Sequence, residues 1–165
     1  MYEQYDENYA ICFSYPRGTQ PAIEILVTNP LNNKSILLDN AVVDSGADCT
    51  SAPSFIGEEH LLHNLQKIKK GTYIYPHQGI GGSDNELDGY LHSGIIQLYR
   101  NNIPIDFLKP LNIDISFLKS KSGHSPNFPF LLGRRDFFLN FYIAFYNTPR
   151  TSNMLLIPRR NIILY

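Results

Sequence analysis

The chain has 165 residues, enough for one domain whose core needs no disulfide bonds. Its 14 basic and 15 acidic side chains give a formal net charge of −1, so charge provides no reason to expect nucleic acid or an anionic membrane as the main partner. The 11 Tyr and 10 Phe favour strands, and two cysteines are too few for a disulfide framework.

The first seven residues are polar and acidic, without the basic start and apolar run of a secretory signal. No apolar stretch in the sequence is long enough to span a bilayer. We therefore expect a cytoplasmic protein with no membrane partner.

Apolar and polar residues alternate in the first quarter of the chain, a pattern typical of half-buried strands. The predicted strands cover residues 9–15, 22–28, 35–38 and 41–43. Residues 29–33 are rich in Asn and contain Pro, so this turn should join the second and third strands into a hairpin. The fourth strand leads directly into Asp44.

The pattern changes after Pro53, where apolar residues recur near helical spacing up to Lys70. Acidic residues stand early in this segment and lysines late, an order that complements the helix dipole. The sequence therefore predicts a helix over residues 53–70, ended by Gly71.

The remainder of the chain again favours strands. They are predicted over residues 72–75, 91–99, 103–107, 113–118, 141–146 and 154–157, with a further apolar run at 128–132. A short helix is expected at 134–139, after Gly133. The prediction is a single mostly β domain over residues 1–165, with one or two helices and a barrel-like or sandwich-like sheet.

Asp44, Ser45 and Gly46 form the most informative local motif. An apolar strand that ends in Asp-Ser-Gly presents a carboxylate from a rigid element, and the Gly46 amide can reach that carboxylate. The Ser45 hydroxyl can form a hydrogen bond sideways. Taken alone, the motif is also an ordinary turn, because Asp, Ser and Gly all favour turns.

Two further motifs follow along the chain. The first is a glycine-rich tip between predicted strands, formed by Gly79, Ile80, Gly81 and Gly82. It lacks the third glycine of a dinucleotide-binding loop and precedes acidic residues, so a phosphate site is not expected. The second is an apolar strand that reaches Gly133 and is followed by Arg134 and Arg135.

In this order, the three motifs resemble those of the retropepsin-like aspartic proteases, the single-lobe family of retroviral proteases and their cellular and bacterial relatives. The resemblance covers roughly residues 20–157 and implies the closed β-barrel of the acid protease fold. It implies Asp44, Ser45 and Gly46 as catalytic residues. It also implies substrate contacts from the loop and the flap tip, namely Ala47, Asp48, Gly79, Ile80, Gly81 and Gly82. Gly133 and Arg134 would be structural, with Arg134 paired to Asp48 unless the adjacent Arg135 takes that place.

The same resemblance implies a homodimeric endopeptidase that needs no cofactor and no metal. Peptide hydrolysis by water needs an acid and a base, which two adjacent carboxylates can supply by sharing one proton. This chain has one Asp-Ser-Gly, since neither Asp106 nor Asp136 is followed by Ser or Thr and Gly. Two copies would bring Asp44 beside its own mate, and the flaps would close over a polypeptide held extended.

Other functions stay open at the level of sequence. A domain of this kind can bind or assemble without cutting, because a fold does not guarantee an activity. A metal hydrolase could use Asp44 and Asp48, and the spacing of His60 and His63 suits a shared metal face on a helix. Cys49 has no evident histidine partner, so a packing role is expected for it.

Overall fold

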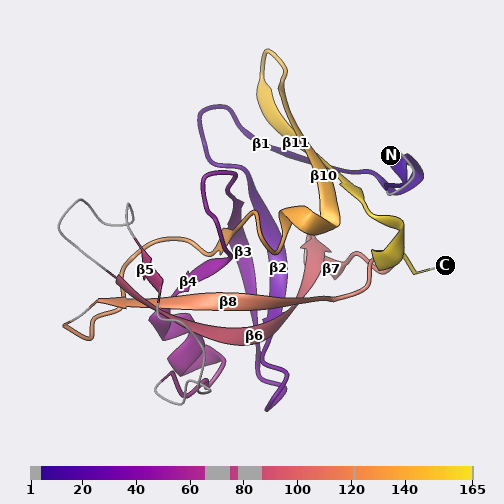
Figure 1. The fold of residues 1–165 in the computed structure, drawn as a ribbon. Coiled ribbons are helices and arrows are strands. Elements are labelled where there is room, and N and C mark those ends of the chain that lie inside the picture. Colours follow the sequence, from indigo (N-terminus) through magenta and orange to yellow (C-terminus); the bar gives the residue numbers. More distant parts are fainter. Residues whose placement is uncertain (1–4, 66–74, 78–86, 121, 165) are drawn as a thin grey trace.

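The computed structural model describes residues 5–65, 75–77, 87–120 and 122–164. Strands form most of the regular structure and belong to two sheets (Figure 1), which confirms the mostly β prediction. The helical segments in these ranges are short, and none of them is long and apolar enough to cross a membrane.

The smaller sheet joins the two ends of the chain. Its order is β1-β11-β10, and both pairings are antiparallel. The strands are β1 (Ile11–Pro16), β10 (Phe141–Asn147) and β11 (Thr151–Pro158), flanked by the 3-10 turns η1 (Glu7–Tyr9) and η4 (Arg160–Ile162). Figure 1 shows this sheet at the opposite end of the molecule from β5.

The larger sheet follows the order β2-β3-β9-β4-β8-β6-β5, and β2 also pairs with β6. The path from β2 to β6 therefore closes into a ring. Its members are β2 (Ala22–Thr28), β3 (Ser35–Val43), β4 (Ser51–Pro53), β5 (Tyr75–His77), β6 (Leu87–Arg100), β8 (Leu111–Ser120) and β9 (Leu131–Leu132), with β7 (Ile103–Pro104) beside β6. The β3–β9 and β4–β8 pairings are parallel.

Most predicted strands are present, with altered lengths. The segments 35–38 and 41–43 form one strand, β3, because a bulge leaves Asp39 and Asn40 opposite Glu24 between two paired stretches. The strands predicted at 103–107 and 128–132 shorten to two residues each, β7 and β9.

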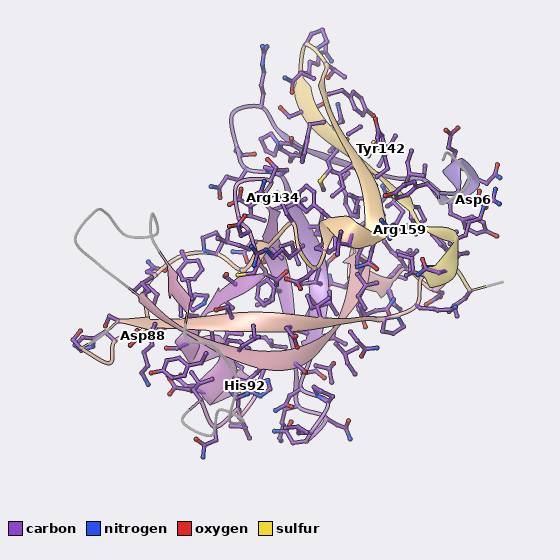
Figure 2. All side chains as sticks on the ribbon, in the orientation of Figure 1. Asp6, Asp88, His92, Arg134, Tyr142 and Arg159 are labelled. Carbon is purple, nitrogen blue, oxygen red and sulfur yellow. The ribbon has the colours of Figure 1, made fainter. Side chains whose placement is uncertain are left out.

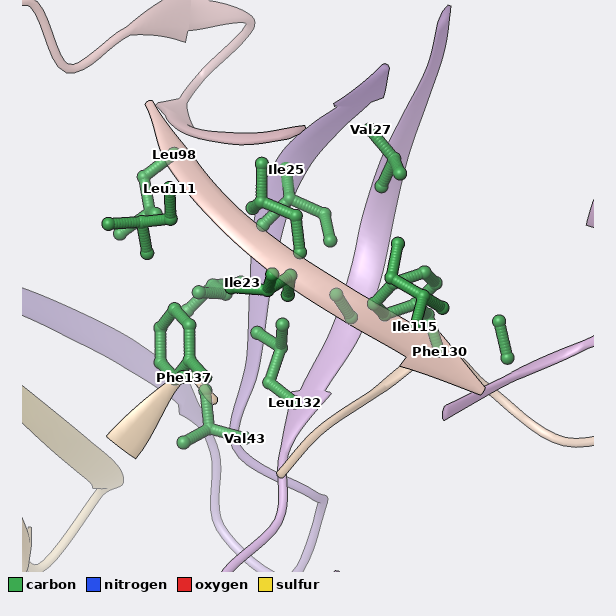
Figure 3. Packing of buried hydrophobic residues seen from close by; sticks show 14 of the residues in the cluster. Ile23, Ile25, Val27, Val43, Leu98, Leu111, Ile115, Phe130, Leu132 and Phe137 are labelled. Atoms are coloured by element: carbon green, nitrogen blue, oxygen red, sulfur yellow. The ribbon is translucent and has the colours of Figure 1, made fainter. Parts of the chain in front are cut away.

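The core lies inside the ring of strands. On β2 every second residue is buried, and Ile23, Ile25 and Val27 point into the core as the alternation predicts. Phe130, Leu132 and Phe137 are buried in the same cluster, and Figure 3 shows Ile23 close to Leu132 and Phe137. This packing fixes the ends of β3 and β9, where the candidate site begins.

The helix predicted over residues 53–70 is confirmed only in its first part. Ser54 and Phe55 are α-helical and lead into η2 (Ile56–His60), which has π-type geometry, and Leu62 then adopts a left-handed φ of 53°. After η2, Leu61, His63 and Leu65 are buried while the residues between them are exposed. This is the period of an extended chain, and two leucines four residues apart fit it as well as a helix. Residues 66–74, which include the predicted helix end, lie outside the described residues.

The second predicted helix is displaced and shorter. A turn in which the Phe137 amide donates to the Gly133 carbonyl at 3.1 Å leads into the 3-10 helix η3 (Phe138–Asn140). Strand β10 begins at the next residue, so the sequence leaves no room for a longer helix.

Candidate functional site

Asp44 lies at the end of β3, where its main chain is held by hydrogen bonds. Its amide donates to the Leu132 carbonyl at 3.1 Å, and the amide of Val42 donates to the Phe130 carbonyl at 2.8 Å. On the other side, the Val43 amide donates to the Pro21 carbonyl at 2.8 Å. The half-buried Asp44 side chain therefore projects from the end of a strand that is hydrogen-bonded on both sides.

The turn after Asp44 orients its carboxylate. The Gly46 amide donates to Asp44 Oδ1 at 2.8 Å, the bond expected from the motif, and the Ala47 amide donates to the Asp44 carbonyl at 3.2 Å. A Cβ at Gly46 would lie 3.1 Å from Asp44 Oδ1, so glycine suits this close approach. Ser45 is exposed at the tip of the turn.

A second loop, which follows β9, crosses the first at very short range. A Cβ placed on Gly133 would lie 2.2 Å from the carbonyl carbon of Cys49, so only glycine fits there. Next along the chain, the Arg134 amide donates to the Ala47 carbonyl at 3.0 Å and the Arg135 amide donates to the Asp48 carbonyl at 2.9 Å. These contacts join the two loops into one rigid unit.

The side chains of Asp48 and Arg134 form an exposed ion pair on this unit, in which Arg134 Nη2 donates to Asp48 Oδ1. The hydrogen bond and the charge of Arg134 hold the pKa of the Asp48 carboxyl below its usual value. Arg135 lowers the pKa of Asp48 less than Arg134 does, and it acts only through its charge. Arg134 rather than Arg135 is therefore the partner of Asp48. Figure 2 labels Arg134 between the two sheets.

Two residues that the sequence analysis did not select, Thr50 and Asp136, complete the crossing. Thr50 is fully buried, its Oγ1 accepts a hydrogen bond from the Gly133 amide at 3.2 Å, and its amide donates to Asp136 Oδ2 at 3.0 Å. Burial raises the pKa of the Asp136 carboxyl, an effect that the bond from the Thr50 amide opposes. No feature of the sequence distinguishes Thr50 from the adjacent Ser51, so the contact becomes visible only in three dimensions.

Cys49 lies in the first loop, where the second loop crosses it, and is half-buried. Its Sγ lies 3.6 Å from the Ser51 hydroxyl. Burial raises the pKa of the Cys49 thiol, which disfavours the thiolate that a nucleophile needs. A packing role fits this environment better than covalent catalysis.

The histidines do not form the shared face that their spacing allowed. His60 is exposed and packs its ring edge against Phe55, whereas His63 is buried against His92 and Phe117. Figure 2 shows His92 well below Arg134, so this cluster is separate from the Asp44 loop. Among the described residues, no group of three or more His, Cys, Asp or Glu side chains could hold a metal ion.

The predicted flap tip, Gly79, Ile80, Gly81 and Gly82, lies outside the described residues. The strands on either side of it in the sequence, β5 and β6, pair in antiparallel fashion from Tyr75 opposite Gly89 to His77 opposite Leu87. β5 and β6 thus pair like the two arms of a hairpin.

Comparisons of the chain with protein-family models, with curated proteins and with solved structures gave no match. What can be said of its function comes from its own residues and their geometry.

Proposed function

We propose that this chain is a subunit of a homodimeric aspartic endopeptidase with a single-lobe, retropepsin-like fold. The observation that carries the proposal is the fixed geometry of Asp44. The Asp44 carboxylate accepts a hydrogen bond from the Gly46 amide at 2.8 Å. It lies at the end of β3, beside buried residues, in a loop that is held by the close contact between Gly133 and Cys49. A plain surface turn needs neither this crossing nor the buried bond from Gly133 to Thr50.

In the proposed mechanism, the Asp44 carboxylates of two copies share one proton and hold a water molecule between them. One carboxylate takes a proton from the water as its oxygen attacks the peptide carbonyl carbon, and the protonated carboxyl donates its proton to the carbonyl oxygen. The tetrahedral intermediate then collapses and the C–N bond breaks. The leaving amine takes up the proton that the first carboxylate took from the water, and a hydroxyl of the intermediate returns a proton to the other carboxylate. Two like charges this close cannot both ionise at low cost, which keeps one carboxyl protonated.

An extended polypeptide is the substrate that suits this arrangement. Since the Ala47 and Asp48 carbonyls already accept the Arg134 and Arg135 amides, Ala47 can offer a substrate its methyl group and Asp48 its amide. The flap hairpin would supply the main-chain contacts on the opposite side of the substrate.

Replacing Asp44 by Asn tests the proposal, because Asn keeps the size of the side chain but cannot act as the acid or base. Cleavage of a mixed peptide library between mildly acidic and neutral pH should fall by about 10²- to 10⁴-fold or more. The wild-type rate should resist a chelator and rise steeply with protein concentration.

The alternatives predict different outcomes of the same assay. A metal hydrolase that uses Asp44 and Asp48 would lose activity in the chelator. A folded, dimeric wild-type chain that cleaves nothing at any of these pH values would instead favour a non-catalytic module that binds peptides or assembles.

A further inference from the structure

The chain that follows η2 is anchored at Leu61. The Leu61 carbonyl accepts hydrogen bonds from Asn29 Nδ2 at 2.8 Å and from Asn32 Nδ2 at 3.1 Å, both in the turn between β2 and β3. The Leu61 amide donates to the Ile56 carbonyl at 3.0 Å, and the Leu61 side chain is fully buried. Leu61 is therefore a fixed point, and a movement of the next residues has to begin after it.

Residues 62–65 begin with a strained turn and end against the larger sheet. The φ of 53° at Leu62 is unfavourable for a leucine, and the side chain of Leu62 is 55% exposed. After it, the buried side chains of His63 and Leu65 hold the segment in place, and the His63 amide donates to the Gly57 carbonyl at 2.8 Å. The left-handed conformation of Leu62 is thus maintained by the burial of the side chains that follow it.

The surface that buries His63 contains a second histidine. The His63 ring centroid lies 4.7 Å from that of His92 on β6 (Figure 2) and 5.3 Å from that of Phe117 on β8. Nε2 of each histidine is buried, and neither has a hydrogen-bond partner among the described residues. Neutral imidazole rings can pack in this way, but two imidazolium rings would be poorly solvated and would repel each other. The contact between residues 62–65 and β6 therefore requires both rings to stay neutral.

The charged groups around this contact do little to stabilise an imidazolium. The described titratable groups on the elements that pack against His63 are Glu58, Glu59 and His60 of η2, Asp88, Tyr90 and His92 on one face of β6, and Lys119 of β8. Glu58 lines a surface hollow of about 420 Å³ beside His63, but its carboxylate pairs with Lys119 Nζ at 2.7 Å. Asp88 stands opposite the same lysine, and Glu59 and His60 are exposed. Burial therefore dominates the environment of His63.

We propose that residues 62–65 form an acid-released latch: when His63 and His92 take up protons, the segment moves away from β6 about Leu62 while the ring of strands stays folded. Opening hydrates both imidazolium rings, separates their charges and lets Leu62 return to an ordinary backbone conformation. The loss of burial of Leu65 opposes opening, which keeps the latch closed at neutral pH. The inference makes no use of the proposed function, so either can fail without the other.

The protonation of His63 sets the size of the effect. Burial lowers the pKa of His63 to about 4 in the closed form, and an exposed His63 in the open form should have a pKa near 6.5. The open form therefore binds more protons as the pH falls, and the opening equilibrium constant should rise about 20-fold from pH 7 to pH 5. Burial also lowers the pKa of His92, so exposure of this second ring should increase the rise.

The His63 amide reports the opening, because its bond to the Gly57 carbonyl exists only in the closed form. Its hydrogen-exchange protection factor, measured by NMR on the full chain and corrected for the chemical exchange rate at each pH, should fall at least about 20-fold from pH 7 to pH 5. Urea below the unfolding transition separates local opening from global unfolding, since local opening exposes little surface. The protection of His63 should change little with urea. The buried Val42 amide, which donates to the Phe130 carbonyl, should be better protected and should lose protection as urea is added.

His63→Phe keeps a ring that can pack against Phe117 but cannot take up a proton, so the amide at position 63 should lose most of its pH dependence. His60→Gln is the matched control, because it removes an exposed histidine three residues away and should retain that dependence. The protection of Val42 shows whether each variant is folded. The inference is overturned if the wild-type His63 amide is unprotected at pH 7 or is equally protected at both pH values. It is also overturned if this amide matches Val42 in protection and urea dependence, or if folded His63→Phe keeps the full pH dependence.

Discussion

At the scale of single residues, His63 shows most clearly how burial controls charge in this chain. Its side chain is 6% exposed, and its ring lies 4.7 Å from that of His92 and 5.3 Å from that of Phe117, centroid to centroid. Nε2 of both histidines has no hydrogen-bond partner among the described residues. Burial, with a smaller contribution from His92, lowers the pKa of His63 to about 4, and burial also lowers the pKa of His92.

The low pKa of His63 predicts that acid destabilises the fold. An unfolded histidine has a pKa near 6.5, so the unfolded chain binds more protons than the folded chain between pH 6.5 and about 4. Stability should therefore fall as the pH falls through this range. From pH 7 to pH 5, His63 should lower the free energy of unfolding by about 2 kcal/mol.

Denaturant unfolding at the two pH values measures this change. His63→Phe should remove most of it, whereas a variant of the exposed His124, His124→Gln, should retain it. An undiminished pH dependence in His63→Phe would show that other groups account for it.

At the scale of elements, the buried Thr50 hydroxyl links the loop after β3 to the loop after β9. In Thr50→Val the Gly133 amide loses its acceptor in a buried position, so the free energy of unfolding should fall by about 1 to 3 kcal/mol. Thr50→Ser keeps the hydroxyl and should be clearly more stable than Thr50→Val. Denaturant unfolding of the two variants compares them. Equal stabilities would mean that the hydroxyl does not hold the crossing.

The elements that the sequence predicts well are those whose pattern is local. The alternation along β2 identifies both the strand and its buried face, and the Asp-Ser-Gly motif identifies the bond from Gly46 to Asp44. The helix predicted over residues 53–70 ends early in its described part, because Leu61 and Leu65 fit the period of an extended chain as well as that of a helix. The flap and the end of that segment fall outside the described residues, so those predictions remain as they were.

Contacts between distant segments could not be predicted from the residues alone. The parallel pairing of β3 with the two-residue β9, the contact of Gly133 with Cys49, and the bond from Thr50 to Asp136 all depend on how the ring of strands closes. The resemblance anticipated an arginine partner for Asp48, and the geometry identified Arg134. Thr50 and Asp136 left no comparable trace in the sequence.

At the scale of the whole molecule, the two sheets have different roles. The larger sheet closes on itself and presents Asp44 at the end of β3, whereas the smaller sheet is open, with β1 and β10 as its edge strands among the described residues. Each chain contains one Asp-Ser-Gly motif. Under the proposed function, a second copy would supply the second carboxylate.

Mixing wild type with Asp44→Asn tests whether activity belongs to the pair. If equal amounts exchange subunits at random, about half of the wild-type chains acquire an inactive partner, so the cleavage rate should fall to about half that of the same wild type alone. The assay uses excess substrate and a protein concentration well above the dimer dissociation constant, and an inert protein added in place of the variant should leave the rate unchanged. A rate that stays constant after full exchange would mean that each chain works with its own Asp44 alone, and the shared-proton mechanism would have to be abandoned.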